Sequence, residues 1–315
     1  MQRKKSLPLS RVEISLLFEG CIRHTTLWQL MAEKKLCINE TPDNPTGEVE
    51  SQEVIETCGE ENSPENNLKP KVPSLTEVIN HMVILQPSSQ EEIQKRLKLC
   101  CSALKDDLSS IERVAKEISE DAAANGCKYI EVGLDPTKFV SDPESEDSLS
   151  FCDIIKAALK GFKAGEGEGK TKVGLLLQCE RGQSGASAGL VTLCESLKDE
   201  GVVGIELTCS TSSVVASLTA EGGTLGNLLF SEEDIALMEQ AKEKKIHRSV
   251  QAGEFGPAEM VFQVTTFMIK VFTYLWKHSK STIRRQIQIH YFVFYYIFHT
   301  QELNIGTKIY KELHN

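Results

Sequence analysis

The chain has 315 residues, a formal net charge of −10 and a pI near 5.4. This length can bury a sizeable core, and the acidic balance argues against nucleic acid as a partner. The basic N-terminus lacks the uninterrupted apolar stretch of a signal peptide, and the ten cysteines include no Cys-x-x-Cys pair. We therefore expect a cytoplasmic protein that has no membrane partner.

The first half of the chain contains an acidic insert followed by helix and strand signals. Residues 38–74 are rich in Pro, Asn and Glu, a composition that predicts a flexible insert. Residues 88–125 show helical spacing of apolar side chains, with Ser89 as a candidate cap and Gly126 as a candidate terminator. A strand is expected directly after this helix, over residues 128–134.

The same helix-then-strand order recurs after residue 150. Apolar strands are expected at residues 173–178, 202–208 and 246–251, and a first strand is expected at residues 12–18. The intervening helices are expected at residues 150–163 and 186–199 and from Ser231 onward. Short apolar strands that alternate with helices are typical of parallel βα units. We therefore predict an α/β fold, a TIM-type barrel that is incomplete, with about five of its eight βα units.

The end of the chain has a different composition. Of the 20 aromatic residues, 12 lie between Phe262 and Tyr310. We place a boundary after residue 264, which gives a partial barrel over residues 1–264 and a divergent tail over residues 265–315. The tail has two open interpretations, a genuine segment of the protein or the product of an alternative exon or intron read-through.

Two segments resemble the adenosine deaminase family of metal-dependent hydrolases. Residues 246–256 are similar to the family's strand that reads His-Ala-Gly-Glu, but Gln251 stands where the family has its zinc-binding histidine. Residues 12–20 are similar to the family's first strand, and the positions of its two histidines hold Ser15 and Leu17. The resemblance implies a barrel that deaminates adenosine to inosine with zinc. It also implies that this chain has lost its metal ligands, so we expect no cofactor and no metal-binding residue.

The resemblance assigns a few candidate site residues. Glu254 matches the family's general acid/base, here expected to be vestigial because no metal-bound water would serve it. Glu19 stands where the family has an aspartate that contacts the ribose, and Gly20 follows it as in the family, so both are candidate substrate-binding residues. Arg181 and Glu206 are expected to form ion pairs at strand ends.

Three functions remain open from the sequence. The first is a member of the family without deaminase activity. The second is an active purine nucleoside or nucleotide deaminase with altered ligands, and the third is a non-catalytic module that binds a nucleoside or a protein. The expected partners are a purine nucleoside and a protein that covers the open edge of the barrel, because exposed strand edges are normally covered.

Overall fold

The structure is a computed structural model, and it describes residues 11–38, 72–84, 90–142, 145, 148–167, 171–182, 189–208 and 231–251. The chain divides into two units, residues 1–257 and 258–315, and all of the described residues belong to the first. Glu254, residues 39–71 of the expected insert (38–74) and the expected tail lie outside the described residues. The predicted boundary after residue 264 therefore stays a prediction.

One parallel sheet forms the centre of the described part. Its strands are β1 (Arg11–Leu17), β2 (Cys127–Leu134), β3 (Lys172–Glu180), β4 (Val202–Thr208) and β5 (His247–Val250). They pair in sequence order, and every pair is parallel. The predicted incomplete TIM-type barrel of five βα units is confirmed.

Helices connect the strands, as the alternating pattern predicts. They are α1 (His24–Glu33), α2 (Leu75–Met82), α3 (Gln90–Leu104), α4 (Leu108–Ala124), α5 (Phe151–Gly165), α6 (Leu190–Leu197) and α8 (Glu232–Glu243). In α8, the Ser231 side chain accepts a hydrogen bond from the Asp234 backbone, as expected for a start near Ser231. Within the described ranges, no helix is long and apolar enough to cross a membrane.

The single helix that we expected over residues 88–125 is two helices. Asp106 has a φ of +55°, a left-handed conformation that ends the regular α3 backbone. Asp107 then caps α4, because its side chain accepts a hydrogen bond from the Ser110 backbone N–H. The apolar periodicity continues through this break, which is why the sequence pattern alone does not reveal it.

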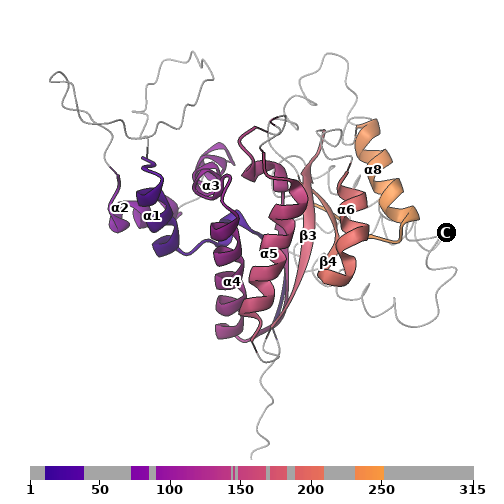
Figure 1. The fold of residues 1–315 in the computed structure, drawn as a ribbon, viewed down its shortest axis with the longest axis horizontal. Coiled ribbons are helices and arrows are strands. Elements are labelled where there is room, and N and C mark those ends of the chain that lie inside the picture. The colour runs from indigo at the N-terminus through magenta and orange to yellow at the C-terminus, as the bar shows by residue number, and fades with distance from the viewer. Residues whose placement is uncertain are drawn as a thin grey trace, which may run out of the picture. The chain divides into compact units, whose positions relative to one another are not determined.

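Helices α4 and α5 lie side by side in very close contact (Figure 1). A Cβ added at Gly161 of α5 would lie 2.1 Å from the carbonyl oxygen of Glu112 and 2.6 Å from the Cβ of Ala115, both on α4. Gly165 meets α4 in the same way one turn later, 2.4 Å from the carbonyl oxygen of Lys116. The two glycines therefore set the distance between these helices.

This contact predicts the effect of a Gly161→Ala substitution. The obstructing atom is backbone, so the helices must separate, and we expect a loss of about 2 kcal/mol in the free energy of unfolding. Gly189→Ala is the control, because a Cβ there meets nothing within 4 Å and φ is −80°. Urea denaturation of both variants measures the difference. Equal stability of the two variants would contradict the close packing of α4 on α5.

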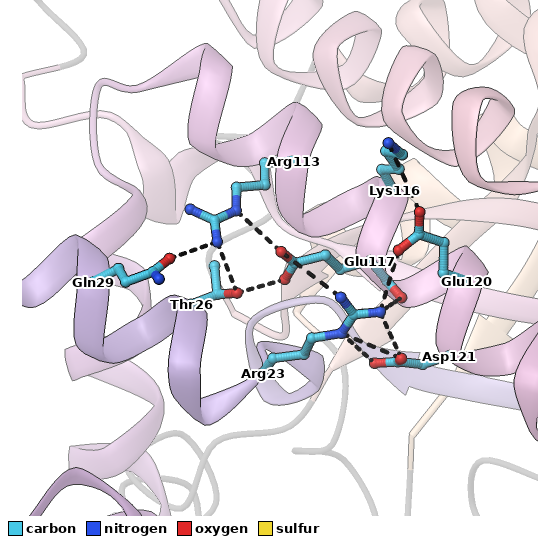
Figure 2. Close-up of polar contacts among 8 residues, drawn as sticks. All are labelled: Arg23, Thr26, Gln29, Arg113, Lys116, Glu117, Glu120 and Asp121. Carbon is cyan, nitrogen blue, oxygen red and sulfur yellow. Dashed lines mark hydrogen bonds and ion pairs between the residues drawn. The ribbon is translucent and has the colours of Figure 1, made fainter. Parts of the chain in front are cut away.

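A polar network joins α1 to α4 (Figure 2). Glu117 of α4 is buried and accepts hydrogen bonds from Thr26 of α1 at 2.7 Å and from Arg113 at 3.0 Å. Arg23, the residue before α1, pairs with Asp121 at 2.7 Å. The hydrogen bond and charge of Asp121 raise the pKa of Arg23, although partial burial acts against this. These contacts therefore hold α1 against α4. Helix α1 follows β1 after a short 3-10 turn.

Candidate functional site

The carboxyl ends of β1 and β2 bring two charged side chains together. The 3-10 helix η1 (Glu19–Cys21) begins two residues after β1, and η2 (Pro136–Phe139) begins two residues after β2. The Lys138 ammonium of η2 lies 2.8 Å from the Glu19 carboxylate of η1. The Glu19 side chain is only 1% exposed, whereas that of Lys138 is 36% exposed. Parallel strands place their carboxyl ends at one edge, where barrel proteins carry their sites.

The surroundings of this ion pair are acidic. Burial would lower the pKa of Lys138, but the charge and hydrogen bond of Glu19, followed by the charge of Asp135, outweigh it and raise the pKa. Burial raises the pKa of Asp135, and the Thr137 hydrogen bond acts in the opposite direction. The second carboxylate oxygen of Glu19 is buried and has no hydrogen-bond partner among the residues that the structure describes.

Helix α3 closes this region from one side. A Cβ added at Gly20 would lie 3.7 Å from Leu97 of α3, so this helix lies close to η1, although Gly20 itself is exposed. The neighbouring Cys100 and Cys101 are buried, as expected for small apolar side chains. Burial, followed by the charge of Glu19, raises the pKa of the Cys100 thiol to about 12. A thiol with this pKa is not a nucleophile at neutral pH.

A second cluster is centred on Glu206 of β4, whose side chain is fully buried. One carboxylate oxygen accepts hydrogen bonds from Ser15 at 3.0 Å and from Ser249 at 2.9 Å. The other oxygen accepts from Gln178 at 2.7 Å and from Gln251 at 3.0 Å. An ionised carboxylate has about four acceptor positions. The four neutral donors therefore use the full hydrogen-bonding capacity of Glu206.

The register of the sheet explains part of this convergence. Gln178 of β3 is the register partner of Glu206, which is in turn the partner of Ser249 of β5, so the three share one face of the sheet. Ser15 lies on β1, three strands from β4 in the sheet order. Only the concave face of a curved sheet can bring β1 within hydrogen-bond distance of β4. Glu206 therefore lies inside the curve of the half-barrel.

Gly133 makes room for this cluster. A Cβ added there would lie 2.1 Å from the amide nitrogen of Gln178, so the Gln178 side chain crosses the position that a larger residue would occupy. The side-chain amide oxygen of Gln178 is buried and has no hydrogen-bond partner within the described part of the chain. The glycine and the glutamine therefore fit each other within the concave face.

The structure places the predicted residues in two groups. Ser15 and Gln251, predicted from separate motifs, meet at Glu206, whereas Glu19 and Gly20 lie at the end of β1 with Lys138. The expectation that Glu206 forms a strand-end ion pair is wrong, because the four hydrogen bonds that it accepts come from hydroxyl and amide groups. Arg181 donates to the backbone oxygen of Gln251 at 2.5 Å. The role of Glu254 stays a prediction.

Comparisons with known proteins agree on one family. The adenosine deaminase family model matches residues 66–269, well over half of the 315 residues. Adenosine deaminase of Gallus gallus is 27% identical over 195 residues, which cover 60% of this chain and 50% of that protein. The Rattus norvegicus enzyme is 30% identical over 159 residues, which cover 48% of this chain and 42% of that protein. The chain thus spans about half the length of the curated relatives that it matches.

Solved structures share the fold. An Arabidopsis N6-mAMP deaminase matches with a TM-score of 0.55 at 19% identity, covering 82% of this chain and 63% of that one. An amidohydrolase from Burkholderia ambifaria, solved with bound Zn, matches with a TM-score of 0.51 at 17% identity, covering 79% of this chain and 53% of that one. At these identities the likeness shows the barrel architecture alone.

These findings correct the expectation of no cofactor. A structural neighbour carries zinc, and the matched family is one that uses zinc, so the absence of a cofactor is not supported. The three described positions where the family motif has histidines nevertheless do not fit that metal. Ser15, Leu17 and Gln251 offer no imidazole, thiolate or carboxylate, the side chains that bind zinc in proteins. In the residues that the structure covers, no three His, Cys, Asp or Glu side chains are grouped as metal ligands.

Proposed function

Because the chain belongs to the adenosine deaminase family, we propose that it is a purine nucleoside-binding member whose deaminase activity is strongly reduced or lost. The observation that carries the proposal is the Glu206 cluster. Ser15 and Gln251, which replace two metal-binding histidines of the motif, both donate to the same buried carboxylate. Both side chains therefore use their polar groups to bind Glu206 inside the half-barrel.

The chemistry of deamination explains why these residues matter. The reaction adds hydroxide to a purine carbon and releases ammonia, and water at neutral pH supplies little hydroxide. Zinc, when bound, supplies it by lowering the pKa of water from about 15.7 to about 7. A serine hydroxyl and a carboxamide have no comparable effect, and Glu206 has its acceptor positions filled. The described residues therefore support binding and positioning more than proton removal from water.

Nucleoside binding is supported by the end of β1. Glu19 follows the first strand at the position where the family motif contacts the ribose, and its second carboxylate oxygen is buried without a partner among described residues. A ribose hydroxyl is a donor that could satisfy this oxygen, and a buried unpaired acceptor costs about 1–3 kcal/mol. Lys138 neutralises the other oxygen, which favours a neutral ligand group over a charged one.

Calorimetry with adenosine tests the binding. We expect a dissociation constant for the full chain in the micromolar to millimolar range, and Glu19→Gln should weaken binding by about tenfold, the loss of one charge-assisted hydrogen bond. Glu131→Gln is a matched control, because it makes the same chemical change at a glutamate outside η1. The Glu131 carboxylate accepts a hydrogen bond from Tyr129, which lies on the same strand, β2. No heat with the unsubstituted chain, or equal affinities for the Glu19 variant and the control, would contradict nucleoside binding at this position.

A further inference from the structure

The Glu206 cluster joins strands that do not pair with each other. β1 and β5 are the first and last strands in the sheet order, and each pairs with a single neighbour in the part of the sheet that the structure describes. Ser15 on β1 and Ser249 on β5 nevertheless share one oxygen of Glu206. Gln251, directly after β5, bonds to the other oxygen. A single buried side chain therefore connects both edge strands through the concave face.

The backbone of β1 is adapted to this connection. Ser15 has a φ of +63°, a left-handed conformation that is unfavourable for any residue other than glycine by about 1 kcal/mol. The register of β1 against β2 shifts between Glu13 and Leu16, so Ser15 lies in an irregular stretch of the strand. Such bulges redirect a side chain. Here the redirected hydroxyl reaches Glu206, and this hydrogen bond offsets the unfavourable backbone conformation.

We propose that Glu206 is a clasp that holds β1 and β5 at a fixed separation and so sets the curvature of the five-stranded sheet. The ladder of backbone hydrogen bonds fixes the spacing of neighbouring strands, but a sheet can still flatten or curl. Bonds across the concave face resist flattening, because flattening would separate Ser15 from Glu206. The clasp is independent of whether a purine binds, so it goes beyond the proposed function.

Hydrogen–deuterium exchange of the full chain tests the clasp. Glu206→Gln removes acceptor capacity, and we expect the amides of residues 11–17 and 247–251 to exchange about tenfold faster, with those of α4 and α5 unchanged. Exchange in β1 is the decisive readout, because β1 lies three strands from β4 and a weakened ladder around β4 would reach only β3 and β5. Glu131→Gln is the control and should leave the edge strands unchanged.

A second variant keeps the test informative if Glu206→Gln loosens the whole fold. Ser15→Ala removes one hydrogen bond on β1, and the clasp predicts faster exchange in residues 247–251, at the opposite edge of the sheet, as well as in β1. Faster exchange at both edges supports the clasp. Exchange that rises only in β1 after Ser15→Ala, or only in β3, β4 and β5 after Glu206→Gln, would overturn it.

Discussion

Replacement of Glu206 by glutamine is expected to lower the free energy of unfolding by about 2 kcal/mol. The carboxylate accepts four hydrogen bonds in a fully buried position. An amide of the same shape keeps one acceptor oxygen, and its NH₂ group meets the donors that faced the other oxygen. The Ser15 and Ser249 hydroxyls can turn to accept from this NH₂ group, so the change replaces four hydrogen bonds to a carboxylate with weaker neutral ones, and among their donors only Gln178 is fully buried. Urea denaturation followed by circular dichroism measures the change.

Glu112→Gln is the matched control for this variant. Glu112 also accepts a short hydrogen bond, from Lys160 at 2.7 Å, but that pair lies at the surface with the Lys160 side chain 72% exposed. Exposed ion pairs contribute about 0–1 kcal/mol, so this variant should remain close to the unsubstituted chain. Comparable losses for the two glutamine variants would show that the Glu206 cluster is not a buried, satisfied network.

Lys138→Met is expected to cost about 3 kcal/mol at neutral pH. Methionine keeps most of the apolar length of the side chain but leaves Glu19, which is 1% exposed, without its ionic partner. Removing one member of a buried ion pair destabilises a protein by about 3–5 kcal/mol, and the partial exposure of Lys138 reduces this figure. The comparison is Lys160→Met, because the Lys160–Glu112 pair has nearly the same length, 2.7 Å, but is exposed.

The pH dependence of the Lys138 effect has a definite sign. The folded protein raises the pKa of Lys138 above its ordinary value of 10.5. The contribution of the ammonium to stability is therefore fully present below 10.5 and is lost as the pH rises through the folded-state pKa. The difference in stability between the unsubstituted chain and Lys138→Met should stay constant near neutral pH and shrink in strongly alkaline solution. A difference that grows with rising pH would contradict the Glu19–Lys138 pair.

Local signals in the sequence predict most of the secondary structure. Apolar runs of strand length, separated by segments of helical spacing, identify the five strands, since a parallel βα pattern has few alternatives. The break between α3 and α4 escapes this reasoning. It depends on the left-handed backbone of Asp106 and the cap by Asp107, and aspartate also occurs inside helices. A lone acidic pair is too weak a signal to interrupt a continuing apolar period.

The sequence predicts only part of the site. The family motifs point to Ser15 and Gln251 as altered positions, but each motif is read along one strand. Their common partner Glu206 follows from the register of neighbouring strands and from the curvature of the sheet, which strand signals do not specify. A usable signal exists nonetheless. Gln178 and Glu206 are polar residues within the apolar runs of neighbouring strands, and buried polar groups of this kind are expected to form hydrogen bonds with each other.

Lys138 gives no signal in the sequence, for a different reason. It lies in the short turn after β2, where nothing in the local sequence separates it from a solvated surface lysine. Its partner Glu19 comes from the turn after β1, 119 residues earlier. Only the alignment of strand ends in a parallel sheet brings the two turns together. A search for opposite charges directly after consecutive strands would have found the pair.

The most direct test of the account is the rate of adenosine deamination by the purified full chain, measured by ammonia release with zinc added in excess. A functional deaminase relative serves as the positive control under the same conditions. The proposed loss of activity predicts a rate lower than that of the relative by at least about 10⁴-fold, because the described side chains provide no means of generating hydroxide at neutral pH. A rate within tenfold of the relative would contradict it.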